Sequence, residues 1–264
     1  MITAFLRNDD IRDSLDDTLE YLTFRAVEAG IPVTHAVEPA NTKDHVVEWL
    51  IEQQAKFPKY IGIIQHGYEH KIKTHPPVRG EFGGGRPFRA QLDDIVRGAA
   101  LMDRFFGKQW TRIFSFPYGT YDSSTLRALE TCKFVAITTG IRLTKKRKLF
   151  NTIGRLLRSK HWMGQNIVYF NEKIPGSRLY ELPVVANNTK RQTGPDTGIQ
   201  KTTDELRTEW SKIRPTVKTR GILCHHRFNS RSDIDQLIGF MQQLKVEGVT
   251  FAKIEDLYEK VGNL

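Results

Sequence analysis

The 264-residue sequence has little cysteine and no long apolar segment. Its two cysteines, Cys132 and Cys224, lie far apart in the chain, which argues against a disulfide framework and fits a reducing compartment. No apolar run approaches the roughly 20 residues that a membrane-spanning helix needs. The first residues lack a charged n-region and run directly into acids, so they are not typical of a signal peptide. We therefore expect a cytoplasmic protein.

The sequence also lacks repeats, low-complexity tracts and an obvious linker. Its length would suit one large α/β domain or two small ones. The hydrophobic content of 39% and the charged content of 27% are ordinary for a globular protein. We expect one domain over residues 1–264, with a basic insertion at about 140–175.

Acidic residues are too few to balance the basic ones, which leaves a net charge of +10. Such an excess favours polyanionic partners: nucleic acid, anionic lipid or a phosphorylated substrate. A nucleic-acid-binding surface would interleave basic residues with exposed aromatic ones. Here the basic residues gather mainly in the insertion and no recognition motif is present, so we expect no nucleic-acid partner.

Strand-like and helix-like patterns alternate along almost the whole chain. This βαβα alternation implies parallel strands joined by helical crossovers. Seven or eight such units in about 260 residues fit a closed barrel better than an open sheet. The expected strands cover 2–6, 31–37, 60–65, 112–116, 134–138, 178–185, 221–224 and 249–252, and the expected helices 14–29, 42–55, 88–106, 123–131, 203–213 and 232–245.

Polar residues follow several of these strands at the end where a barrel carries its catalytic groups. One Asp and two His can hold Zn²⁺ or a related ion and leave positions for water and substrate. A second, adjacent Asp could then take a proton from metal-bound water, and a cation offsets the cost of placing two carboxylates together. These residues are Asp9 and Asp10, His66 and His70, Pro117 and Tyr118, and His225 and His226.

Each group also has an ordinary explanation when it is taken alone. With eight histidines in the chain, the spacing of His66 and His70 can arise by chance. An Asp-Asp pair often starts a helix, where carboxylates favour the positive end of the dipole. The pair of late histidines can be structural. It is the placement of all the groups at strand ends that favours a site.

The order and spacing of these groups resemble the polysaccharide deacetylases of the NodB-homology type, carbohydrate esterase family 4. The similarity extends from Asp9 to His225, and it looks like that of a divergent member. The matching stretches are Asn8-Asp9-Asp10, His66-Gly67-Tyr68-Glu69-His70, Phe114-Ser115-Phe116-Pro117-Tyr118-Gly119 and Leu223-Cys224-His225.

The resemblance implies a deformed (β/α)7-8 barrel and metal-dependent removal of an N-acyl group, such as acetyl, from an amino sugar. By the same resemblance the ion would be zinc, with cobalt, nickel or manganese as alternatives. The implied roles are metal binding for Asp10, His66 and His70, general base for Asp9, oxyanion stabilisation by the Tyr118 N–H, and protonation of the leaving amine by His225.

Two departures from the family pattern concern residues that orient the catalytic groups. Ser115 stands where the family usually has an arginine beside the catalytic Asp, and we expect Arg86 or Arg89 to supply that charge. An acid that orients the late histidine is not obvious. Its candidates are Glu172, Glu181 and Asp196, of which Glu181 is preferred.

Substrate contacts are expected near the glycine-rich loop and the Pro-Tyr motif. The residues assigned to them are Pro117, Arg86, Arg89 and Glu81. The departures leave open an alternative on the same fold, a catalytically impaired carbohydrate-binding protein.

The stretch 142–160 holds eight Lys or Arg and no acid, with apolar residues at helical spacing and Trp162 just beyond. A basic amphipathic helix of this kind suits an anionic membrane surface. The basic insertion also fits an amino-sugar substrate that is linked to a lipid or a nucleotide. Such a substrate would belong to surface-polysaccharide or glycolipid biosynthesis, for example of O-antigen or lipopolysaccharide. The protein would then lie peripherally at the inner membrane face. A helix that packs on the barrel with a solvated basic face is the alternative.

Overall fold

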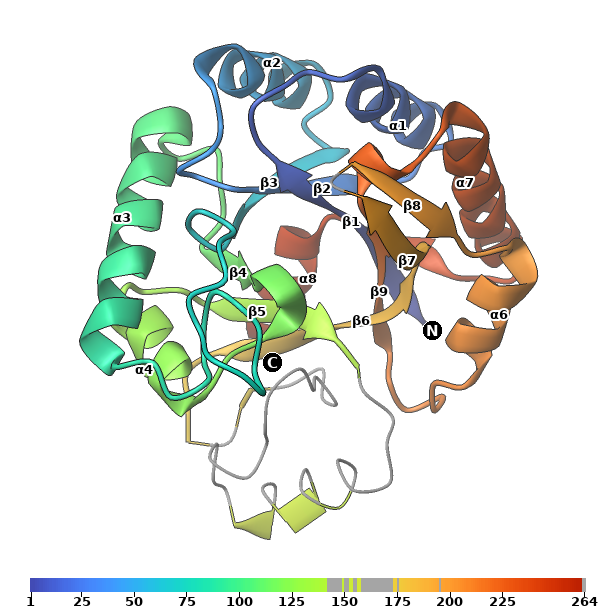
Figure 1. Cartoon of the computed structure of the whole chain (residues 1–264). Coiled ribbons are helices and arrows are strands. Elements are labelled where there is room, and N and C mark those ends of the chain that lie inside the picture. The colour runs from blue at the N-terminus through green and yellow to red at the C-terminus, as the bar shows by residue number, and fades with distance from the viewer. Residues whose placement is uncertain are drawn as a thin grey trace. The chain divides into compact units, whose positions relative to one another are not determined.

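The computed structural model describes residues 1–141, 149, 152–153, 156–157, 173–174, 176–194 and 196–262 (Figure 1). Most of the basic insertion lies outside these residues, including much of its expected amphipathic helix, Trp162 and Glu172. The chain divides into two compact units. The first comprises Met1–Val37, Thr42–Ile63 and Val184–Leu264, and the second Glu38–Asn41 and Ile64–Pro183.

The first unit is built around β1 (Thr3–Ile11), which pairs in parallel with β2 (Val33–Val37), β9 (Thr219–Cys224) and β10 (Thr250–Phe251). The apolar first half of β1 is fully buried, so its polar second half is held firmly in place. The helices of this first unit are α1 (Asp17–Glu28), α2 (Asp44–Lys56), α6 (Thr203–Ser211), η3 (His226–Phe228), α7 (Arg231–Val246) and α8 (Ile254–Gly262).

The second unit contains α3 (Phe88–Phe106), β4 (Ile113–Ser115), η1 (Pro117–Gly119), α4 (Ser123–Thr131) and β5 (Ala136–Gly140). Strand β4 pairs in parallel with β5 and with the end of β3 (Ile61–His66). The rings of Phe82 and Phe134 pack edge-on against Phe114, with centroids 5.3 and 5.4 Å away. This aromatic core fixes β4, and the β3–β4 register places His66 directly opposite Ser115.

The hydrogen-bonded strands follow the order β10-β1-β2-β3-β4-β5-β6-β9, where β6 is Tyr180–Asn187, and β9 also pairs with β1. The order of seven strands, β1 to β6 and β9, therefore closes on itself, as in a parallel (β/α) barrel. The expected barrel class is confirmed. The extent of one domain over 1–264 stays a prediction.

Four elements differ from expectation: β1, the two strands of a hairpin, and α8. Strand β1 does not end at residue 6 but continues to Ile11, so Asp9 and Asp10 lie within it. The antiparallel hairpin of β7 (Thr189–Gly194) and β8 (Thr197–Gln200) was not expected, because its polar and mostly exposed residues show no apolar alternation. Helix α8 also lies beyond the last expected element.

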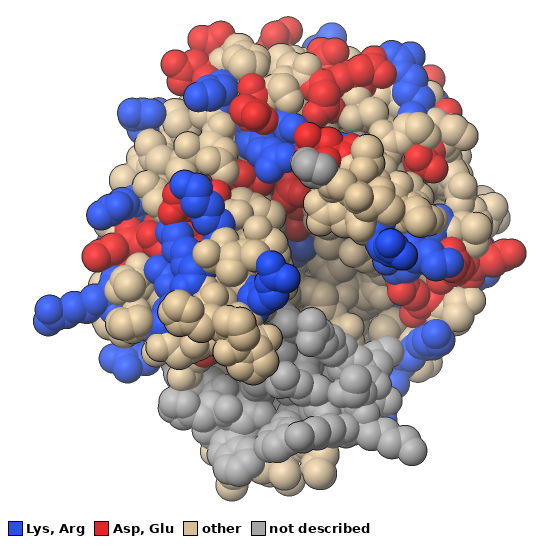
Figure 2. Space-filling model, in the orientation of Figure 1, with Lys and Arg blue, Asp and Glu red and all other residues tan. Residues whose placement is uncertain are grey.

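Basic and acidic side chains are interspersed on the face shown in Figure 2. The largest block of excess positive charge in the sequence falls in the insertion, outside the described residues. Among the helices that the structure describes, none is long and apolar enough to cross a membrane.

Candidate metal centre

Arg7 and Asp9 form a buried ion pair on β1. Arg7 Nε donates to Asp9 Oδ1 at 2.8 Å and Nη2 donates to Oδ2 at 2.9 Å, while the two residues are only 3% and 2% exposed. Residues two apart in a strand point to the same face, which brings the two side chains together. Arg7 thus holds the carboxylate expected to act as base. This overturns the expectation that Arg86 or Arg89 does so.

Asp10 lies at an irregularity of β1. Between Asn8 and Ile11 the strand advances three residues, while its partner β2 advances two, from His35 to Val37. Such a bulge changes the direction of a side chain, and bulges are common next to active sites. Asp10 has a φ of 64° and is 6% exposed. The bulge therefore gives Asp10 an orientation that regular alternation would not.

His66 ends β3 and contacts Ser115 through its Nδ1, 2.9 Å from the serine Oγ. A histidine that binds a metal through one ring nitrogen usually donates a hydrogen bond from the other, which fixes its tautomer. The contact at Nδ1 makes Nε2 the ring nitrogen suited to a metal. Ser115, which stands where the family pattern has an arginine, therefore orients a histidine that is expected to bind a metal.

His70 is held by Tyr118. The phenol donates to the His70 carbonyl oxygen at 3.0 Å, and the two rings lie 4.7 Å apart between centroids. Tyr118 itself has a φ of 58° and is 45% exposed. The sequence suggested a role only for its backbone N–H, but its side chain also holds His70, the second histidine expected to bind a metal.

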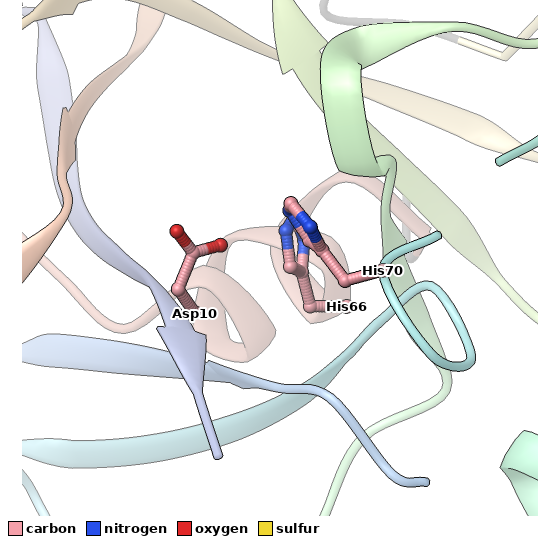
Figure 3. A group of neighbouring side chains, drawn as sticks. All are labelled: Asp10, His66 and His70. Atoms are coloured by element: carbon pink, nitrogen blue, oxygen red, sulfur yellow. The ribbon is translucent and has the colours of Figure 1, made fainter. Parts of the chain in front are cut away.

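Asp10, His66 and His70 each offer one ligand atom, and these three atoms lie within 4.8 Å of one another. Figure 3 shows the two imidazole rings close together, with the Asp10 carboxylate directed toward them. One carboxylate oxygen and two imidazole nitrogens are a donor set suited to zinc and neighbouring divalent ions. The residues expected to bind a metal are thus brought together.

Unusual backbone conformations coincide with these residues. In the described part of the chain, four non-glycine residues have a positive φ: Asp10, His70, Tyr118 and Lys133. Such conformations cost energy and persist where the surroundings impose them, often at functional sites. Three of the four are residues that the sequence had already placed in the site.

His225 follows β9 and is half-buried. In the β1–β9 register Asn8 is paired with Cys224, so Asp9 and His225 come next on neighbouring strands. Asn229 Nδ2 donates to the His225 carbonyl at 2.7 Å and anchors the turn. The expected base on β1 and the expected acid just after β9 thus lie next to each other on adjacent strands.

His226, by contrast, belongs to a buried polar network. Asn8 Oδ1 accepts from the His226 N–H at 3.0 Å and lies 3.2 Å from its Nδ1, and Asn8 Nδ2 lies 3.3 Å from Nδ1 of His35. Burial lowers the pKa of His35 to about 3, so this ring is neutral. This network fixes Asn8, the residue immediately before Asp9. Nothing in the sequence pointed to the network.

Asp16 is an acid beside the second of the late histidines, 3.3 Å from Nε2 of His226. Burial raises the pKa of Asp16, but its interaction with His226 and hydrogen bonds from Thr18 and the Leu19 N–H outweigh burial and bring that pKa well below the usual range. Of the earlier candidates, Asp196 pairs with Arg12 at 3.0 Å, Glu181 is 1% exposed on β6, and Glu172 is outside the described residues.

The four residues assigned to substrate contacts differ in their burial and in their contacts. Pro117 is buried against Gly67, and Glu81 is fully buried with its carboxylate bound to backbone N–H groups. Their assignment to substrate contacts stays a prediction. Arg86 is half-buried and pairs with Asp94 at 2.9 Å. Arg89 is exposed on the first turn of α3, and its role stays a prediction.

The contact between Ser115 and His66 gives a first prediction. Ser115→Ala should weaken divalent metal binding by about 10- to 100-fold, because loss of a partner that orients a ligand has effects of that size. Isothermal titration of the metal-free protein with Zn²⁺ measures it. Thr131→Ala, which removes an exposed hydroxyl bonded to the Arg127 carbonyl, should bind as the wild type does. Equal affinity for both variants would contradict the role of Ser115.

No family model matches the sequence, and no curated protein matches it. Solved structures do. A Mycobacterium smegmatis protein described as a polysaccharide deacetylase has a TM-score of 0.64 at 16% identity, over 93% of this chain and 77% of its own. A Clostridium thermocellum family 4 acetyl xylan esterase, solved with a cobalt ion, has a TM-score of 0.58 at 10% identity, over 97% and 90%.

A mutant of a family 4 pseudoenzyme is also similar, with a TM-score of 0.53 at 11% identity, over 97% of this chain and 67% of its own. At these identities the similarity establishes architecture, and both active enzymes and a pseudoenzyme share it. The chain has the fold of the family 4 carbohydrate esterases, which confirms the resemblance at that level.

Proposed function

We propose that this protein is a metal-dependent hydrolase that removes an N-acyl group, most simply acetyl, from an amino sugar. The observation that carries the proposal is the group formed by Asp10, His66 and His70, whose ligand atoms lie within 4.8 Å. Its placement in a barrel shared with family 4 deacetylases adds support. Activity itself depends on the residues around this group.

Asp10, His66 and His70 would hold the ion, which when bound polarises the acyl carbonyl and lowers the pKa of a water molecule. Asp9 acts as the general base that takes a proton from the attacking water. Arg7 orients the Asp9 carboxylate through two hydrogen bonds. The Tyr118 N–H stabilises the oxyanion, and His225 protonates the departing amine.

The second candidate is a carbohydrate-binding protein that has lost turnover. Similarity to a family 4 pseudoenzyme and the serine in place of the motif's arginine favour it. The ion pair of Arg7 and Asp9 weighs against it, because the charge that the motif lost is supplied from β1. We therefore favour the enzyme.

The substrate's attachment, the pathway and the location are further parts of the proposal. We infer from the basic insertion that the amino sugar is linked to a lipid or a nucleotide, that the chain meets an anionic membrane peripherally from the cytoplasmic side, and that it serves surface-polysaccharide or glycolipid biosynthesis. Flotation with anionic and neutral vesicles tests the membrane contact. If the protein binds neither kind of vesicle, the proposed membrane contact is wrong.

The activity is tested by measuring acetate release from N-acetylchitooligosaccharides and from UDP-N-acetylglucosamine. We expect release that stops after chelation and returns with Zn²⁺ or Co²⁺. Binding of such a sugar by the metal-loaded protein without any release would support the carbohydrate-binding candidate instead.

A further inference from the structure

The segment between the two histidine ligands folds over a buried carboxylate. Glu81 comes from the loop that precedes α3 and is fully buried. Its Oε1 accepts from the Glu69 N–H at 2.8 Å, and its Oε2 accepts from the Tyr68 N–H at 3.1 Å. Two successive backbone N–H groups that face one anion form a concave anion site, here filled by the chain's own side chain.

Glu81 and its neighbours leave no room for a side chain at Gly67. Gly67 has a φ of +60°, and a Cβ there would lie 2.2 Å from Glu81 Oε2 and 2.3 Å from Pro117 Cγ. Its N–H donates to the Ser115 carbonyl at 3.0 Å. The backbone that leads from His66 toward His70 is thus enclosed by Glu81, Pro117 and Ser115.

A charged cluster supports the same segment from the other side. Lys73 Nζ lies 2.5 Å from Glu69 and 2.9 Å from Asp94, and 3.9 Å from Glu81. Arg86 pairs with Asp94 and also donates to the Glu81 carbonyl oxygen. These contacts tie the loop of Glu81 to the segment that carries His70.

A buried glutamate is costly unless its hydrogen bonds compensate. Burial raises the pKa of Glu81, although the two N–H groups and Lys73 act in the opposite direction. What the carboxylate provides is a fixed backbone next to a ligand: His70 has a φ of 53°, a conformation that persists only where its surroundings impose it.

We propose that Glu81 is a positioning residue for the metal ligand His70. Its carboxylate fixes the Tyr68 and Glu69 N–H groups and thereby sets the backbone from which His70 reaches the metal. This inference rests on the proposed metal centre and assigns Glu81 a role in building it. The competing explanation is a general structural brace that affects stability but not metal binding.

Glu81→Gln separates the two explanations. Glutamine offers an acceptor oxygen to one N–H but presents its own NH₂ group to the other, so the segment should relax. We expect Zn²⁺ affinity to fall by about 10- to 100-fold, as for other residues that orient ligands. The visible absorption of the Co²⁺-loaded protein should change as well, because His70 would meet the ion in a different geometry.

Glu130→Gln is the matched control. Glu130 Oε1 also accepts a backbone N–H, from Arg178 at 2.8 Å, but on the segment before β6. Both variants should lose stability, and only Glu81→Gln should change the metal affinity and the Co²⁺ spectrum. If Glu81→Gln does not fold, Glu81→Asp carries the test, since it keeps the charge but not the reach, with Glu130→Asp as its control.

A folded Glu81→Gln protein with the wild-type Zn²⁺ affinity and Co²⁺ spectrum would overturn this inference and leave the proposed function standing. A wild-type protein that takes up no metal would overturn the proposed function itself, and with it the role of Glu81. The two failures are therefore distinguishable in one experiment.

Discussion

Asp9→Asn is expected to lower kcat for acetate release by about 10²- to 10⁴-fold, the range typical for loss of a general base. Asparagine keeps the shape of the side chain but cannot take a proton from the attacking water. Because Asp9 is not one of the three expected ligands, the variant should retain a wild-type amount of bound metal. Steady-state kinetics and metal analysis of the same preparation measure both effects.

The control for this variant is Asp13→Asn, which removes a carboxylate that is 56% exposed from the loop after β1. It should leave kcat unchanged. Asp9→Asn also removes the negative partner of Arg7, so its free energy of unfolding is measured alongside. A folded Asp9→Asn variant with wild-type kcat would contradict the role of Asp9 as base.

Arg7→Met should reduce the free energy of unfolding by about 3–5 kcal/mol, the cost of removing one member of a buried ion pair. The Asp9 carboxylate, 2% exposed, would lose two charge-assisted hydrogen bonds and remain buried. A carboxylate that is no longer held in place should also act less well as a base, so kcat should fall. Urea denaturation gives the stability, and steady-state kinetics report the second effect.

Two comparisons isolate the contribution of the Arg7–Asp9 ion pair to stability. Arg12→Met breaks an ion pair with Asp196 in which that aspartate is 53% exposed, and exposed pairs contribute only about 0–1 kcal/mol. The double variant Arg7→Met/Asp9→Leu removes both charges and should recover much of the lost stability, because an apolar pair can replace a buried ionic one. A stability for Arg7→Met close to that of Arg12→Met would contradict this interpretation of the pair.

The alternating apolar pattern was enough to predict the barrel, because parallel strands buried on both faces and amphipathic helices leave distinct periodicities. Helices α3 and α4 begin and end at the predicted residues. The site residues followed from their position at strand ends. The hairpin of β7 and β8 left no such signal, since its residues are mostly polar and exposed.

The residues that orient the site were harder to predict. Arg7 could have been found, because it stands two residues before Asp9 and strand geometry puts both on one face. The contact between Ser115 and His66 depends on the β3–β4 register, and the network of His226 and Asn8 depends on the β1–β9 register. A single sequence does not specify registers between strands far apart in the chain.

Glu81 and Asp10 show a second reason why the arrangement of the site could not be predicted from the sequence. A bulge in β1 directs Asp10, and a residue's insertion into one strand is invisible until the partner strand is known. Glu81 was assigned to substrate contacts together with the glycine-rich loop in which it lies. Its burial arises from the fold of the segment between His66 and His70, which depends on contacts with Pro117 and Ser115.

The most direct test of the metal centre is the metal content of the purified wild-type protein, compared with His70→Ala and with His75→Ala, an exposed histidine in the loop that follows His70. After incubation with Zn²⁺ and gel filtration, mass spectrometry should find one bound divalent ion per chain in the wild type and in His75→Ala, and little in His70→Ala. A folded wild-type protein that neither contains nor takes up a divalent metal, or a His70→Ala variant that binds it as tightly as the wild type, would contradict the account.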